Sequence, residues 1–120
     1  MIARRGVAAL ALVLAEAVPA AAQDGVDLGA LAQCIADSGA RFYGAHWCPY
    51  CRKQKEMFGS HASSLPYVEC YDGPKSEGMN RRCTRERIDG FPTWEFASGE
   101  RSGGVKSPRA LAAATGCPID

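Results

Sequence analysis

The chain of 120 residues lacks an excess of charge of either sign, because 14 Lys and Arg face 13 Asp and Glu. That balance gives no support to nucleic acid or an anionic membrane surface as a partner. The chain also lacks internal repeats, low-complexity tracts and a domain linker, and its length suits one domain. After residue 22 it lacks any apolar run of the roughly 20 residues that a membrane span needs.

The first segment has the organisation of a secretory signal peptide. Two arginines come first, an apolar run covers residues 6–18, and three alanines close the segment. This order predicts cleavage after residue 22 and export, with a bacterial periplasm favoured and a eukaryotic secretory route left open. An uncleaved membrane anchor is the alternative, which the short apolar run disfavours. We therefore expect a signal segment over residues 1–22 and one domain over residues 23–120.

Cysteine is plentiful in this short chain, and every cysteine follows the expected signal segment. An even number of cysteines in a small exported domain favours disulfide bonds over metal ligation or isolated thiols. The six cysteines are Cys34, Cys48, Cys51, Cys70, Cys83 and Cys117.

The pattern of apolar residues and turn signals predicts alternating helices and strands. Helices are expected over residues 27–38, 49–61, 79–88 and 108–115, and strands over 40–45, 65–71, 93–97 and 101–105. This order predicts an α/β fold with a central mixed sheet of about four strands and helices on both faces. The first strand–helix–strand unit should be parallel and right-handed.

A Cys-Pro-Tyr-Cys motif at residues 48–51 lies where a predicted strand hands over to a predicted helix. At a helix N-terminus, unpaired N–H groups and the helix dipole favour the thiolate, which is the nucleophile of disulfide exchange. Cys48, nearer that end and expected to be more exposed, is the predicted attacking thiol, and Cys51 the resolving thiol.

The motif has three other interpretations. A purely structural disulfide between Cys48 and Cys51 would close a small, strained ring. A zinc site would use these two cysteines with Cys70 and Cys83, although an oxidising compartment disfavours free thiolates. Haem attachment requires histidine after the second cysteine, and residue 52 is arginine, so it is excluded.

Two segments together resemble the thioredoxin superfamily: residues 47–51, and residues 90–93 with the sequence Gly-Phe-Pro-Thr. The resemblance implies a thioredoxin-like fold in which Pro92 is a cis-proline that faces the Cys-x-x-Cys turn. It also implies that the backbone of Phe91 contacts the bound substrate chain and that Trp47 covers the site or supports the substrate.

The chain is more closely similar to the thioredoxin-like domain fused to bacterial vitamin K epoxide reductase homologues. The segments that carry this resemblance are residues 42–48, 54–56, 66–70 and 90–95, together with Cys83. The membrane helices of those homologues are absent here, so such a partner would be a separate protein. Tyr50 replaces a histidine that this subgroup would be expected to carry. Phe42 stands where thioredoxins carry a buried acid that accepts a proton, and the loss of this acid argues against a thioredoxin-style reductase.

The remaining cysteines are candidates for structural bonds. A bond between Cys70 and Cys83, which the resemblance also implies, would stabilise the domain by about 3 kcal/mol, and a second redox pair is the alternative. By elimination Cys34 would pair with Cys117, and two free or intermolecular thiols are the alternative. Glu69 is a candidate proton acceptor for Cys51. The favoured alternative is that it is a surface residue of the strand.

These observations predict an exported enzyme, a thiol–disulfide oxidoreductase that acts on protein thiols and disulfides through Cys48 and Cys51. Trp47, Phe91 and Pro92 are the predicted substrate-binding residues. No metal or organic cofactor is expected, and a separate membrane redox protein is the expected resetting partner. A non-catalytic binding module and a glutaredoxin-like reductase are the alternative functions.

Overall fold

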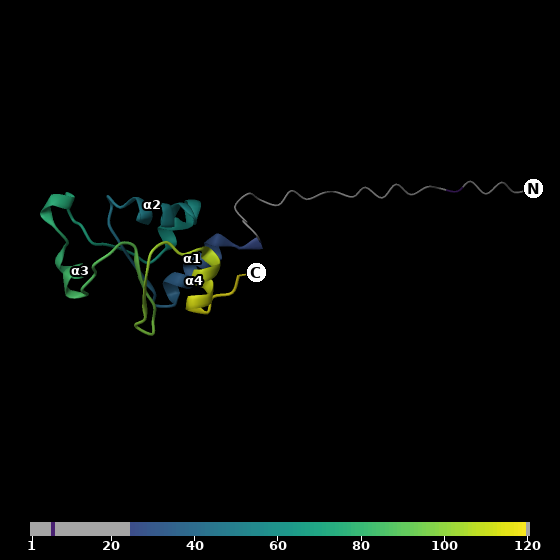
Figure 1. The fold of residues 1–120 in the computed structure, drawn as a ribbon. Helices are drawn as coiled ribbons and strands as arrows, with labels where there is room; N and C mark the ends of the chain where they lie inside the picture. Colours follow the sequence, from purple (N-terminus) through teal and green to yellow (C-terminus); the bar gives the residue numbers. More distant parts are fainter. Residues whose placement is uncertain (1–5, 7–24, 120) are drawn as a thin grey trace, which may run out of the picture.

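The structure is a computed structural model that describes Gly6 and residues 25–119 (Figure 1). The expected signal segment, residues 1–22, lies outside the described residues except for Gly6. Among the residues that are described, no helix has both the length and the apolar character needed to span a membrane.

A mixed four-stranded sheet with the order β2-β1-β3-β4 forms the centre of the domain. The strands are β1 (Arg41–Gly44), β2 (Tyr67–Glu69), β3 (Thr93–Glu95) and β4 (Arg101–Gly103). β1 is parallel to β2 and antiparallel to β3, and β3 is antiparallel to β4. The predicted mixed sheet of about four strands is confirmed.

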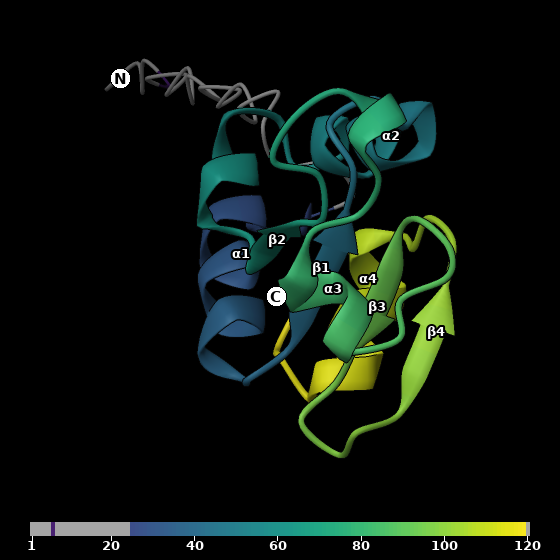
Figure 2. The ribbon, with the colours of Figure 1, turned by 90° about the vertical axis from the view of Figure 1, so that its left-hand side faces the viewer.

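Helices cover both faces of the sheet, as predicted. They are α1 (Leu28–Asp37), α2 (Pro49–Glu56), α3 (Arg81–Arg85) and α4 (Pro108–Thr115), with 3₁₀ helices η2 (Gly59–Ser64) and η3 (Lys75–Glu77). Figure 2 shows α3 in front of the sheet and α4 behind it.

The two faces follow from the alternation of side chains along β1. Phe42 packs in the larger buried cluster with residues of α1 and α4, and it stacks on Trp94 with ring centroids 4.8 Å apart. Tyr43 points the other way, into a smaller cluster with the two cysteines Cys70 and Cys83. The larger core therefore lies on the α1 and α4 side, while α3 covers a small core of its own.

A buried amide fastens α2 to the sheet. The Oε1 atom of Gln54 accepts hydrogen bonds from the indole N–H of Trp94 at 3.1 Å and from the backbone N–H of Lys106 at 2.8 Å. Its Nε2 atom donates to the carbonyl oxygen of Lys106 at 2.9 Å. Because Gln54 and Trp94 are both fully buried, this amide takes the place of water for the polar groups around it.

Helix α2 is shorter than predicted. The α-helix ends at Glu56, and the chain continues as η2 rather than as α-helix to residue 61. Gly59, the first residue of η2, has φ 52°, a left-handed conformation that an α-helix does not contain.

Helix α3 is also shorter than the predicted 79–88, because both of its ends are fixed by local hydrogen bonds. Asn80 caps the first turn by accepting from the N–H of Cys83 at 3.2 Å. At the other end the N–H of Ile88 donates to the carbonyl oxygen of Cys83 at 3.1 Å, and Arg87 has φ 55°. This is the position where glycine commonly ends a helix, and a non-glycine residue there costs about 1 kcal/mol.

Candidate active site

Cys48 lies at the N-terminal end of α2, immediately after the turn that follows β1. It is the N-cap residue, in an extended conformation, and Pro49 occupies the first turn. Its N–H donates to the carbonyl oxygen of Ala45 at 3.0 Å, and its own carbonyl oxygen accepts from the N–H of Arg52 at 3.2 Å. The structure thus places Cys48 at the N-terminal end of α2, where the sequence predicted the attacking cysteine.

The loop at Phe91 and Pro92 faces this thiol. The Phe91–Pro92 peptide bond is cis, and the thiol of Cys48 donates to the carbonyl oxygen of Phe91 at 3.7 Å. Cys48 is the more exposed of the two cysteines, as expected, but both are buried, with exposed fractions of 5% for Cys48 and 2% for Cys51. The residue is covered because the 91–92 loop and the neighbouring aromatic side chains pack over the turn.

Three aromatic side chains, here called the aromatic trio, pack edge to face beside Cys48. The ring centroids of Trp47 and Tyr71 are 5.2 Å apart, those of Trp47 and Phe91 5.8 Å, and those of Tyr71 and Phe91 5.9 Å. The ammonium of Lys75 lies 4.0 Å from the centre of the Trp47 ring. The structure thus brings Trp47 and Phe91 to the thiol together with Tyr71, which the sequence analysis missed although it follows β2 at the same end of the sheet.

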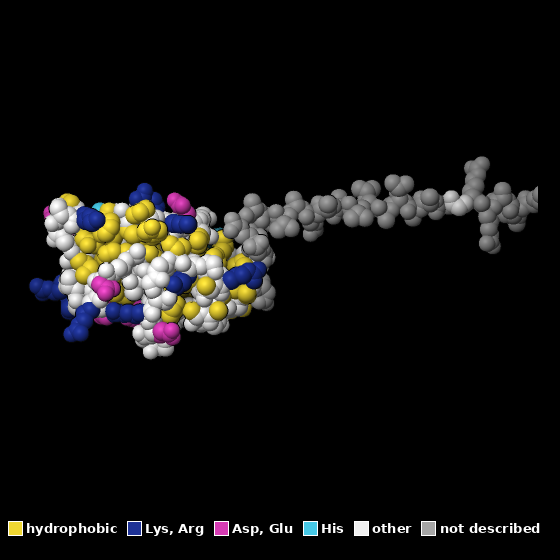
Figure 3. Space-filling view, in the orientation of Figure 1, with side chains coloured by type: hydrophobic (Ala, Val, Ile, Leu, Met, Phe, Trp, Pro, Cys, Tyr) yellow, Lys and Arg dark blue, Asp and Glu magenta, His cyan; other side chains and the backbone are white. Residues whose placement is uncertain are grey.

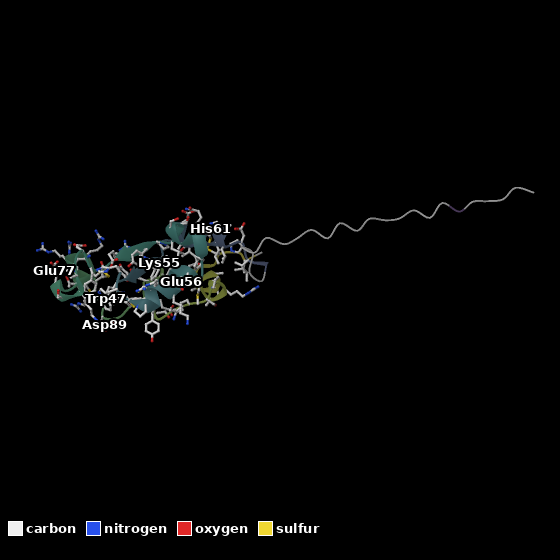
Figure 4. The ribbon with its side chains drawn as sticks, turned by 90° about the horizontal axis from the view of Figure 1, so that it is seen from above. Trp47, Lys55, Glu56, His61, Glu77 and Asp89 are labelled. Carbon is white, nitrogen blue, oxygen red and sulfur yellow. A yellow bond between two sulfur atoms is a disulfide. The ribbon has the colours of Figure 1, made fainter. Side chains whose placement is uncertain are left out.

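The indole N–H of Trp47 is buried and has no hydrogen-bond partner among the described residues. Figure 4 shows Trp47 nearer than Lys55 to the end of the molecule that carries Glu77 and Asp89. A buried donor without a partner is unfavourable, so the indole N–H of Trp47 has an unmet hydrogen-bonding requirement.

Cys51 lies in the first turn of α2 and is almost fully buried. The pKa of its thiol is raised to about 12, mainly by burial and to a smaller extent by the neighbouring Cys48, although a backbone hydrogen bond at Ala45 and the charge of Lys55 act in the opposite direction. At neutral pH Cys51 is therefore a thiol, which suits a residue that reacts second.

Gly44 makes room for this arrangement. A methyl group at Gly44 would lie 3.1 Å from the sulfur of Cys51 and 2.5 Å from a ring carbon of Tyr67. Tyr67 fills the space under the motif, with the ammonium of Lys55 3.5 Å from the centre of its ring. Burial and the nearby carboxylate of Glu69 raise the pKa of Tyr67.

Glu69 holds the turns around the site rather than standing free at the surface. Its Oε1 accepts from the hydroxyl of Tyr67 at 3.1 Å, and its Oε2 accepts from the N–H of His46 at 3.1 Å and of Tyr71 at 3.3 Å. These bonds tie the turn before Cys48 to the end of β2. Glu69 therefore positions the segments that carry two members of the aromatic trio, Trp47 and Tyr71.

The other four cysteines are bonded in pairs, and Cys48 and Cys51 are free thiols. Disulfides join Cys34 to Cys117 and Cys70 to Cys83, with Cα atoms 6.0 Å and 5.4 Å apart. The zinc-site alternative is wrong, because two of its four ligands are consumed in the second bond. The described residues contain no group of three or more side chains placed to hold a metal ion.

Comparison with known proteins adds to this geometry. No family model matches the chain. Over 94 residues the chain is 40% identical to the thiol-disulfide oxidoreductase LTO1 of Arabidopsis thaliana. The match covers 76% of this chain and 25% of LTO1, so the chain spans about a quarter of the length of that relative. The mixed four-stranded sheet with helices on both faces is a thioredoxin-like α/β fold.

Proposed function

We propose that this chain is a thiol–disulfide oxidoreductase that exchanges disulfides with protein substrates through Cys48 and Cys51. One observation carries the proposal: of six cysteines, the two free ones lie together at the start of α2, and Cys48 faces the carbonyl oxygen of Phe91. The similarity to a protein named as a thiol-disulfide oxidoreductase supports the same activity.

In the reducing direction, the thiolate of Cys48 attacks one sulfur of a client disulfide. The client S–S bond breaks, a bond between Cys48 and the client forms, and the departing client sulfur takes up a proton. Cys51 then loses its proton and attacks the sulfur of Cys48, which releases the second client thiol. The client gains two electrons and two protons, and the protein loses them in forming the Cys48–Cys51 bond. The reverse sequence oxidises a client dithiol.

The client segment is proposed to bind along Phe91 and Pro92. Because Cys48 is nearly buried, the client sulfur has to reach it at the edge between Trp47 and Phe91. The carbonyl oxygen of Phe91, which accepts from the thiol of Cys48, offers a hydrogen-bonding group there.

Variants of the two cysteines test this function. Wild-type protein should reduce insulin with a dithiol as electron source, and Cys48→Ser should abolish the activity. Cys51→Ser should accumulate mixed disulfides through Cys48, because the resolving thiol is missing. Equal activity in the wild type and Cys48→Ser would remove the enzyme hypothesis and favour a binding module. Activity with glutathione as the sole reductant would identify a glutaredoxin-like reductase instead.

The proposal extends to location and partner. The organisation of residues 1–22 supports export to the periplasm, and the resemblance to domains fused to vitamin K epoxide reductase homologues supports a separate membrane redox protein as the resetting partner. Fractionation of cells that express the tagged full chain tests the first. Identification by mass spectrometry of the proteins trapped on Cys51→Ser tests the second, since the partner should be among them.

A further inference from the structure

An arginine patch covers α3 and the residue that ends it. It consists of Arg81, Arg82, Arg85 and Arg87, all exposed and without an ion-pair partner within the described part of the chain. Glu86, the acid inside this segment, is already paired with Arg101 at 3.3 Å. Figure 3 shows dark-blue side chains projecting at the end of the molecule where α3 lies. The patch therefore presents uncompensated positive charge.

A cavity of about 370 Å³ lies between one residue of this patch, Arg87, and the loop at Phe91 and Pro92. Asp89 and residues 101–104, of β4 and its end, also line it. Phe91 belongs to both regions, because its carbonyl oxygen accepts from the thiol of Cys48. A client segment lying across Phe91 thus has its neighbouring side chains beside Arg87.

Arg87 is the residue whose conformation points to a role in binding. Its φ of 55° is a backbone conformation that glycine adopts more easily, and the position ends a helix where glycine is common. The conformation ends α3, and the choice of arginine over glycine at a position that lines this cavity motivates a hypothesis of function. Asp89 also lines the cavity, but the three arginines of α3 keep the surroundings positive.

We propose that the arginine patch binds acidic side chains that flank the exchanging disulfide of the client, with Arg87 as the nearest contact. The inference rests on the proposed function and names its substrate class: protein segments rich in aspartate and glutamate. Exposed charge pairs each change affinity by a factor of about 1.4 to 5, and salt screens them. The selectivity should therefore be moderate, cumulative and sensitive to ionic strength.

Three disulfide substrates test the proposal on the full chain. Two are peptides of matched sequence, one with aspartate and glutamate around its disulfide and one with asparagine and glutamine; the third is a small uncharged disulfide. Wild-type protein should react with the acidic peptide about tenfold faster than with the amide peptide at low salt. That ratio should approach one in about 1 M salt.

Two single variants locate the effect. Arg87→Gly should lower the preference for the acidic peptide about threefold, leave the rate with the uncharged disulfide unchanged, and keep or raise the melting temperature. Lys53→Gln removes one exposed positive charge from α2 and should leave the preference unchanged. The triple change of Arg81, Arg82 and Arg85 to Gln should reduce the preference further than Arg87→Gly.

The outcomes separate the two proposals. Equal wild-type rates with the acidic and amide peptides, or equal losses in Arg87→Gly and Lys53→Gln, would overturn the acidic-client inference while exchange with the uncharged disulfide still supports the activity. Failure to exchange with any of the three disulfides would overturn the proposed function and the inference with it.

Discussion

Replacing Gln54 by leucine tests how α2 is held on the sheet. The change keeps the size of the side chain and removes its amide. It leaves the indole N–H of Trp94, which is fully buried, without its acceptor. It also removes the partners of the N–H and C=O groups of Lys106, which are partly buried.

The expected loss follows from these three groups. A buried polar group left without a partner costs about 1–3 kcal/mol. The Trp94 indole should show the full cost, whereas the backbone of Lys106 regains some contact with water and the leucine gains some apolar burial. We expect a net decrease of about 3 kcal/mol in the free energy of unfolding. A domain of this size remains folded after such a loss.

Urea denaturation of the wild type, Gln54→Leu and Gln33→Leu measures the effect. Gln33 is exposed on α1 and bonds only to the side chain of Asp37, so its substitution should change stability by less than about 0.5 kcal/mol. The Gln54 variant should lower the urea midpoint by about 2 M at an unchanged slope. Equal urea midpoints for the two variants would refute the conclusion that the hydrogen bonds of Gln54 hold α2 on the sheet.

Two further predictions concern the buried residues beneath Cys48, namely Cys51 and Gly44. Burial raises the pKa of Cys51 from 9.0 to about 12, so the stability its buried thiol contributes is fully present below pH 9 and is lost as the pH rises toward 12. The measurement is the free energy of unfolding with Cys48 and Cys51 reduced and both disulfides intact. From pH 9 to 12 it should fall more steeply in the wild type than in Cys51→Ser. The same pH dependence in both proteins would contradict this prediction. Gly44→Ala should destabilise by about 1–3 kcal/mol through its clash with Tyr67, whereas Gly103→Ala, with nothing within 4 Å, should not, as thermal unfolding would show.

Elements defined by local signals were predictable from the sequence. The final helix begins and ends at the predicted residues, Pro108 and Thr115, because Ser107 caps its first turn and Gly116 takes the left-handed conformation that ends it. The Cys-x-x-Cys turn was predictable for the same reason, since β1, the turn after it and Pro49 all lie within residues 41–49.

Features that depend on distant contacts were not predictable. The burial of Gln54 depends on Lys106 and Trp94, which lie in other elements. The near-burial of Cys48 depends on the loop at Phe91, and the aromatic trio forms only because the end of β2 meets that loop. Helix α3 was predicted too long because the side chain of Asn80 and the backbone of Arg87 end it by hydrogen bonds and conformation rather than by composition.

The burial of the Cys70–Cys83 disulfide has a consequence under the proposed function. Thiol attack requires access to a sulfur atom, and Cys70 and Cys83 are fully buried, whereas Cys117 is 7% exposed and Cys34 is partly exposed. Client thiols would therefore have no direct route to the bond that joins the end of β2 to α3. Exchange at Cys48 and Cys51 could then proceed while this cross-link stays in place.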